Sequence, residues 1–164
     1  MNNGTDYTTV ATGTLDGNGE KMVSVKVRKN RSYVIRLDPP PNWCYMNEVS
    51  YSYTIQGDQN PTFDFTFAEC AYLKLNINNV NCQGSTDYFK LYHYGSDVGF
   101  LNASQGNPIR EGGGCYSYIG SDFSSVPMGG RYYRWEVTRN GVTNTYYDTL
   151  YLNPGEYKTY DINY

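Results

Sequence analysis

Apolar and polar residues alternate with a period of two over most of the chain. The pattern is clearest at residues 49–55, which read Val-Ser-Tyr-Ser-Tyr-Thr-Ile. Successive side chains of a strand point to opposite faces, so a segment of this kind buries one face and exposes the other. The same alternation predicts further strands at residues 21–27, 32–37, 63–67, 73–77, 87–94, 131–138, 142–152 and 156–164.

Turn signals separate these segments. Asn140-Gly141 tolerates the positive φ angles of a tight hairpin, and Asn153-Pro154-Gly155 predicts another turn. The prolines of residues 39–41 predict a rigid loop, and residues 95–114 a long one. The fold class predicted is all-β, an antiparallel β-sandwich or jelly roll of about ten or eleven strands, with residues 1–164 as a single domain.

The composition argues against two kinds of partner. The net charge is −3 and only 18% of residues are charged, whereas binding to nucleic acid phosphates needs a basic stripe. The one basic cluster, residues 26–31, is expected at a solvated hairpin end, with an anion or glycan contact as the alternative. No apolar run reaches the roughly 18 residues of a membrane span, so no membrane insertion is expected.

The four cysteines are even in number and show no CxxC spacing. They are Cys44, Cys70, Cys82 and Cys115. A zinc site is not expected, because the chain has only one histidine to join them. Proximity in the chain favours the pairs Cys44–Cys70 and Cys82–Cys115, with free thiols as the alternative. Disulfides would place the protein outside the cell or on its surface, or on a virion surface.

No residue pattern indicates catalysis, a metal or a cofactor. His93 is the only histidine and falls on the apolar face of its strand. Residues 16–20 alternate oxygen ligands as a calcium loop does, but a hairpin turn is expected there. Gly112-Gly113-Gly114 is expected to be a flexible connection. Carboxylates that could form a hydrolase pair are Asp58, Asp64, Glu69, Asp87, Asp97, Glu111 and Glu136.

Aromatic residues are in surplus, since the chain contains 19 tyrosines. Several fall opposite the apolar face of their strands: Tyr88, Tyr92, Tyr94 and Tyr132. Rigid amphipathic rings serve sugar-binding faces and protein interfaces. The alternative is that two sheets bury some strands on both faces. The ligand contacts expected from the sequence are Trp43, Tyr45, Tyr92 and Tyr94.

Three segments resemble known extracytoplasmic β domains. Gly13-Thr14-Leu15 through Leu37, a G-x-L with a polar turn and two alternating strands, resembles the start of bacterial accessory domains of the prepeptidase C-terminal type. Residues 152–160 are similar to the last hairpin of secreted immunoglobulin-like modules. Cys82 followed by residues 87–91 resembles a CUB domain, without its N-terminal cysteine context or its acidic calcium site. These resemblances imply non-catalytic binding and carry over no functional residues.

The first functional hypothesis is therefore a non-catalytic extracellular or surface binding module for a carbohydrate or a surface protein. The second is a structural or assembly protein, such as a viral or phage capsid or fibre component, with its tyrosines in subunit interfaces. The third is a small glycoside hydrolase. The ligand and the oligomeric state are left open.

Overall fold

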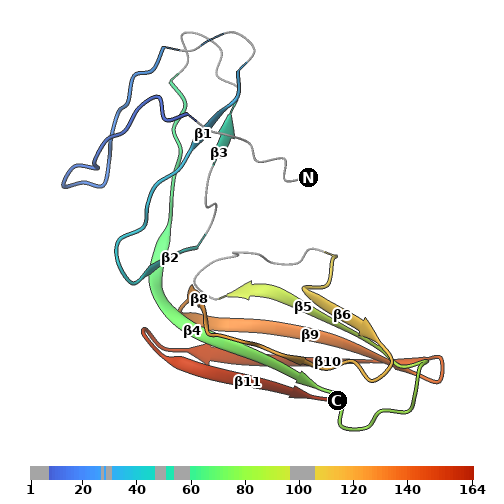
Figure 1. Ribbon diagram of the computed structural model, residues 1–164. Helices are drawn as coiled ribbons and strands as arrows, with labels where there is room; N and C mark the ends of the chain where they lie inside the picture. The colour runs from blue at the N-terminus through green and yellow to red at the C-terminus, as the bar shows by residue number, and fades with distance from the viewer. Residues whose placement is uncertain (1–7, 27, 29–30, 47–50, 54–59, 97–105) are drawn as a thin grey trace. The chain divides into compact units, whose positions relative to one another are not determined.

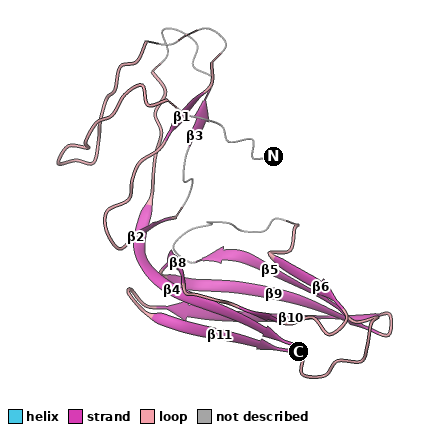
Figure 2. Ribbon diagram, in the orientation of Figure 1, coloured by secondary structure: helices cyan, strands magenta, loops and turns pink. Residues whose placement is uncertain are grey.

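The computed structural model describes residues 8–26, 28, 31–46, 51–53, 60–96 and 106–164. These residues contain strands and no helix, which confirms the all-β prediction (Figures 1 and 2). Within them, therefore, no helix is long and apolar enough to cross a membrane. The strands are β1 (Tyr33–Ile35), β2 (Trp43–Tyr45), β3 (Tyr51–Tyr53), β4 (Phe67–Asn78), β5 (Tyr88–Ser96), β6 (Arg110–Gly113), β7 (Tyr118–Ile119), β8 (Ser124–Pro127), β9 (Gly129–Arg139), β10 (Val142–Leu152) and β11 (Tyr157–Asn163).

The chain forms two compact units. The smaller consists of residues 1–35 and 52–62, and the larger of residues 36–51 and 63–164. The regular structure described in the smaller unit is the pairing of β1 with β3. The boundary between the two units falls after Tyr51, the first residue of β3. The expectation of one domain over residues 1–164 stays a prediction.

The larger unit contains two sheets. One has four strands in the order β10-β9-β5-β6, all antiparallel. The other is built around β4, which pairs antiparallel with β2, β7 and β8 and parallel with β11. The β4–β11 pair is the exception to the antiparallel pattern that the alternation predicted.

A shared apolar core joins the two sheets as a β-sandwich. Inward residues of β4 and β11 pack with inward residues of β5, β9 and β10. Each fully buried aliphatic or phenyl side chain contributes about 1.5–3 kcal/mol through its removal from water. Among the described residues, the largest fully buried apolar side chains are Ile77, Phe89, Leu91, Leu152 and Ile162.

The two late turns behave differently from each other. Asn140 and Gly141 both have positive φ, 49° and 78°, and connect β9 to β10 as the predicted hairpin. The turn at residues 153–155 instead leads the chain from one sheet to the other. There the Gly155 N–H donates to the Cys70 carbonyl at 2.7 Å, which starts β11 beside β4. The expected hairpin at residues 152–160 is therefore wrong.

Three other expectations from the sequence are corrected. A strand is expected at residues 21–27, but the described residues of this segment are not in a strand. A strand is also expected at residues 63–67, but β4 begins only at Phe67. The expected long loop at 95–114 contains β6, and residues 97–105 lie outside the described part. Alternation alone does not define a strand, because an extended segment can alternate without belonging to a regular ladder of backbone hydrogen bonds.

The triple glycine is a constrained segment and not a flexible connection. Gly112 and Gly113 pair with Phe89 and Tyr88 in β6, and Gly114 has a φ of 65°. A Cβ atom on Gly112 would overlap the ring of Tyr116. The absence of a side chain therefore lets the Tyr116 ring lie against β6.

Both disulfides join the cysteines that proximity in the chain favours. Cys44–Cys70 links β2 to β4, with 5.2 Å between Cα atoms, and Cys82–Cys115 links the loops after β4 and β6, with 5.3 Å. Loops of 26 and 33 residues are closed in this way. Restricting the unfolded chain over such lengths contributes about 3–4 kcal/mol for each bond. Two disulfides suggest an oxidising, extracellular-type environment.

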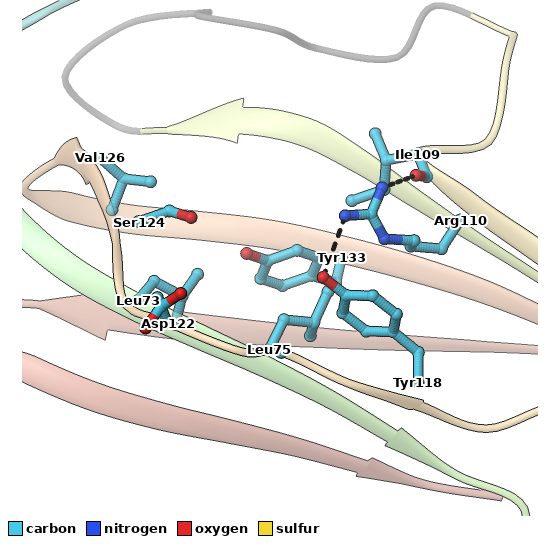
Figure 3. Close-up of a pocket in the computed structure, with 10 residues that line it drawn as sticks. Leu73, Leu75, Ile109, Arg110, Tyr118, Asp122, Ser124, Val126 and Tyr133 are labelled. Atoms are coloured by element: carbon cyan, nitrogen blue, oxygen red, sulfur yellow. Dashed lines mark hydrogen bonds between the residues drawn. The ribbon is translucent and has the colours of Figure 1, made fainter.

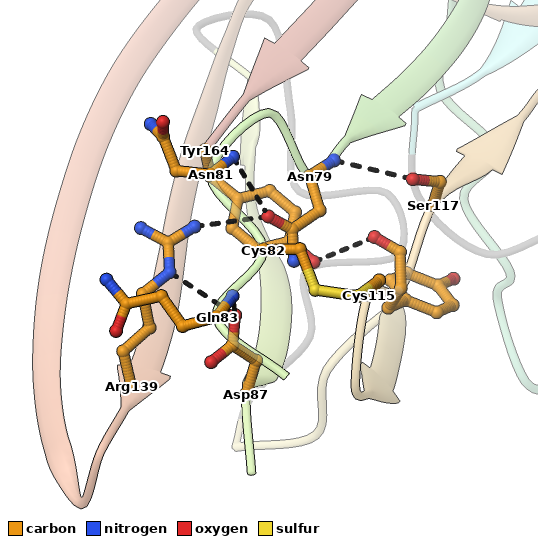
Figure 4. The surroundings of a disulfide bond; sticks show 10 residues. Asn79, Asn81, Cys82, Gln83, Asp87, Cys115, Ser117, Arg139 and Tyr164 are labelled. Atoms are coloured by element: carbon orange, nitrogen blue, oxygen red, sulfur yellow. Dashed lines mark hydrogen bonds and ion pairs between the residues drawn. A yellow bond between two sulfur atoms is a disulfide. The ribbon is translucent and has the colours of Figure 1, made fainter. Parts of the chain in front are cut away.

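A buried ion pair lies beside the second disulfide (Figure 4). The Asp87 side chain is fully buried, and its Oδ2 lies 3.4 Å from Arg139 Nε and accepts the Gln83 N–H at 2.9 Å. Arg139 also donates to Asn79 Oδ1 at 3.2 Å. The Gln83 N–H, followed by the Asn79 amide and Arg139, lowers the pKa of Asp87 against the opposing effect of burial. These contacts of Asp87, Arg139 and Asn79 connect the end of β9 to the loop that precedes β5.

Replacing Gly112 by alanine is expected to destabilise the protein by about 1–3 kcal/mol, because the new methyl group must displace the Tyr116 ring. Gly113→Ala is the matched control. Its Cβ would find no atom nearer than 3.5 Å, and its φ is not in the left-handed region. Urea unfolding measures both variants, and equal stabilities would contradict the packing described for Tyr116.

Acid is expected to weaken the protein partly through Asp87. Its folded pKa is below the ordinary value near 3.8, so its stabilising effect is complete above that value and is lost as pH falls through the folded pKa. Asp87→Asn should be less stable than the parent at neutral pH and should lose less stability between about pH 5 and about pH 2.5. Urea midpoints at both pH values measure this, and parallel losses in the two proteins would refute the assignment.

Candidate ligand-binding face

The outer face of the four-stranded sheet carries a group of tyrosines, which we call the tyrosine face. Alternation and strand register place its members on β5, β9 and β10: Tyr88, Tyr92, Tyr94, Tyr132, Tyr147 and Tyr151. Five of them are 39–75% exposed. The sixth, Tyr92, is only 6% exposed. An exposed cluster of large aromatic rings on one sheet is the feature of this surface that calls for a function.

The strand register arranges the middle of this face in rows across the sheet. Arg134 of β9 lies between Tyr92 of β5 and Tyr147 of β10. The neighbouring position on β9 toward the start of the strand is Tyr132, opposite Thr149. Side chains directly opposite on antiparallel strands have Cβ atoms about 4.5–5.5 Å apart, so these rings and polar groups form one continuous surface.

Arg134 organises the aromatic rings around it. Its guanidinium carbon lies 4.1 Å from the ring centre of Tyr92 and 5.4 Å from that of Tyr94. Its Nη2 lies 3.4 Å from the Glu136 carboxylate, to which the Tyr92 hydroxyl also donates at 3.4 Å. Arg134 and Glu136 lie against Tyr92, which agrees with its low exposure. Tyr92 therefore supports the face, while Tyr94 and Tyr132 are open to solvent.

Polar and charged groups continue the face toward β6. Lys90 is paired in register with Glu111 on one side and with Glu136 on the other. The Tyr88 hydroxyl donates to Glu111 at 2.9 Å, and this hydrogen bond raises the pKa of Tyr88. The face therefore offers cationic donors and carboxylate acceptors next to exposed rings.

The four contacts expected from the sequence are divided between the two sheets. Tyr92 and Tyr94 belong to the tyrosine face, while Trp43 and Tyr45 are on β2, which pairs with β4. Trp43 is 41% exposed. Tyr45 has an internal role, because its hydroxyl donates to the Leu37 carbonyl and its ring lies 5.0 Å from that of Phe67.

A small cavity opens at the edge of the sandwich between the two sheets (Figure 3). Its volume is about 170 Å³, and Leu73, Leu75 and Tyr133 form part of its wall. Arg110 lies along the Tyr118 ring at 4.6 Å and donates to the Tyr118 hydroxyl and the Ile109 carbonyl. Ligand pockets usually measure about 300–1,000 Å³, so this cavity is less suited to a ligand than the open tyrosine face.

The other candidate groups have structural partners. His93 is buried, with its ring 5.3 Å from that of Tyr133. Asp16 Oδ1 accepts the N–H groups of Glu20 and Asn18, which lowers the pKa of Asp16, and residues 16–20 form a turn. The described residues on either side of this turn are not in strands, so it does not form the expected hairpin. No cluster of three or more metal-ligating side chains occurs within the described ranges.

The candidate carboxylates are dispersed. Asp58 and Asp97 lie outside the described residues, and Asp87 is in the buried ion pair. Glu111 and Glu136 share the open tyrosine face, on strands separated by β5.

The contacts expected from the sequence do not include Tyr147, Tyr151 and Arg134. The Tyr146-Tyr147 doublet of β10 places one ring on each face, and alternation cannot say which is outward. Pairing with β9 decides it, because Tyr146 is opposite Trp135 and Tyr147 is opposite Arg134. Tyr146 stacks on Trp135 at 5.7 Å, on the side of the sheet that faces the core.

Replacing Arg134 by methionine is expected to destabilise the protein by about 0.5–2 kcal/mol, because the cation over Tyr92 and the ion pair with Glu136 are both lost. Lys90→Met is the control and should cost less, since Lys90 Nζ is 5.7 Å from the centre of the Tyr88 ring and forms no ion pair within the described residues. Chemical denaturation compares the two, and a neutral Arg134→Met variant would contradict the role assigned to Arg134.

Comparison of the chain with family models, curated proteins and solved structures finds no match. The resemblances noted in the sequence therefore stay predictions. The tyrosine face is the feature of the molecule that supports a function.

Proposed function

We propose that this protein is a non-catalytic binding module that acts outside the cell or on a surface, and that the tyrosine face binds carbohydrate. The observation that carries the proposal is the group of five exposed tyrosines on one side of a single sheet. Burial of the core does not require these rings, because the inner positions of the same strands already provide it.

The chemistry of the face suits a sugar. An exposed phenol ring presents an apolar surface to the C–H groups of a sugar, and its hydroxyl exchanges hydrogen bonds with sugar hydroxyls. Arg134, Lys90 and Glu111 add donors and an acceptor at the sides of these rings. Tyrosine has few rotatable bonds, so ordering it on binding costs little entropy.

The form of the face also favours an extended ligand. The rings extend across three strands of an open sheet and do not line an enclosed cavity. A chain of sugar units suits Tyr94, Tyr132 and Tyr147, because these rings are distributed over three neighbouring strands. The disulfides agree with a compartment in which such glycans are found.

Single alanine substitutions at Tyr94, Tyr132 and Tyr147 are expected to weaken glycan binding by about tenfold each, or about 1.4 kcal/mol, and the triple variant should not bind. A glycan array identifies the ligand class, and titration calorimetry with the selected oligosaccharide measures the affinities. Trp43→Ala, measured in the same way, reports whether β2 contributes to the site.

Tyr157→Ala is the matched control for this series. Tyr157 is 64% exposed but belongs to the sheet built around β4, where it stacks on Tyr72. Its loss should leave the affinity unchanged. Absence of binding to every glycan, or equal losses in Tyr157→Ala and the face variants, would contradict the proposal and favour the structural or assembly role.

A further inference from the structure

The free edge of β10 is unlike the other sheet edges of the larger unit. β10 is the outermost strand of its sheet, has 11 residues, and is exposed from Val142 to Thr149. Its residues 142–147 include no charged side chain and no proline. By contrast, β6 and β2 have only 4 and 3 residues, and β11 carries Lys158 and Asp161. Proteins usually protect a long edge by charge, proline or cover, because its backbone groups are ready to pair with another strand.

The hairpin geometry shows which backbone groups of β10 face outward. The two-residue turn at Asn140-Gly141 makes Arg139 and Val142 a hydrogen-bonded pair, so even-numbered residues of β10 bond to β9. The N–H and C=O groups of odd-numbered residues then point to the free edge. Two side-chain contacts agree with this assignment, since Thr149 N–H donates to Asp148 Oδ1 at 2.7 Å and Lys158 Nζ donates to the Tyr151 carbonyl at 3.2 Å.

Those two contacts also divide the edge into a protected and an open part. The N–H of Thr149 and the carbonyl of Tyr151 already have partners. Thr143, Thr145 and Tyr147 have no such side-chain contact to their outward backbone groups in the described structure. The open part is therefore short, uncharged and centred on Thr145.

We infer that two copies of this chain pair through this open part of β10, antiparallel about a two-fold axis at Thr145. In that register Thr145 meets Thr145 of the second copy, and Thr143 meets Tyr147. Each of these pairs exchanges both N–H···O bonds, because all three residues direct their backbone groups outward. The four-stranded sheets then join into one continuous sheet.

The register centred on Thr145 suits two β10 edges better than a register centred on Tyr147 or on Asp148. Pairing about Tyr147 would place Thr145 opposite Thr149 and Thr143 opposite Tyr151, where backbone groups are already bonded. Pairing about Asp148 would bring two like charges together. Pairing about Thr145 places Asp148 opposite Val142, and threonine opposite threonine is a favourable cross-strand pair. This inference is independent of what the tyrosine face binds.

The test is the mass in solution of the intact, oxidised protein over a range of concentrations, by light scattering or sedimentation. The parent chain should change from 18.7 kDa toward twice that mass as the concentration rises. Thr145→Pro should remain a folded monomer, because it removes an N–H that β9 does not use. Thr145→Val, which keeps that N–H, should still dimerise.

Thr145→Lys gives a second test that leaves the backbone unrestricted. It places two like charges at the two-fold axis, while Glu136 on β9 can still pair with the lysine within one copy. This variant should also be monomeric, with unchanged circular dichroism. In the parent, hydrogen exchange should show the Thr145 and Tyr147 amides becoming protected as the dimer forms.

A parent chain that stays monomeric at every concentration would overturn the inference, as would a dimer that persists in both Thr145→Pro and Thr145→Lys. Tyr94→Ala, the glycan-binding variant, should dimerise normally. Loss of glycan binding and loss of dimerisation are thus separate results, and neither failure implies the other.

Discussion

The burial of one apolar face from each of two sheets is the constraint on which the larger unit depends. Ile77 and Ile162 of one sheet meet Phe89, Leu91 and Leu152 of the other, and all five side chains are removed from water. Because side chains alternate along a strand, each inward position fixes an outward one beside it. The tyrosine face is the outward set on β5, β9 and β10, so its position follows from the packing of the core.

Polar interactions complete this arrangement where apolar packing ends. At one end, Asp87 and Arg139 are hydrogen-bonded to the loop that enters β5, next to the Cys82–Cys115 disulfide (Figure 4). A buried charge is tolerated only when it is paired and hydrogen-bonded, and the low pKa of Asp87 expresses that requirement. The disulfide restricts the unfolded chain, whereas the ion pair acts in the folded state, so the two stabilise the same corner by different means.

The proposed roles use two different properties of one sheet. Glycan binding would use its outer face, where Arg134 supports Tyr92 and leaves Tyr94 and Tyr132 open. Dimerisation would use its edge, where odd-numbered residues of β10 direct their backbone groups outward. A dimer through that edge would place two tyrosine faces on the same side of a continuous sheet. Two linked sites raise the strength of binding to a repeated ligand without any new contact.

Local patterns along the chain are sufficient to predict the fold class, most of the strands from residue 73 onward, the Asn140-Gly141 hairpin and the outward position of Tyr88, Tyr94 and Tyr132. Each of these follows from local rules, namely the period of two and the φ angles that a turn requires. The packing of strands against one another places β10 and β11 in different sheets and makes β11 parallel to β4. It also places the Tyr116 ring against Gly112, Tyr147 on the tyrosine face and Tyr45 in an internal contact. These are questions of which strand lies next to which. A local pattern cannot answer them, because the same alternation serves any partner that covers the apolar side.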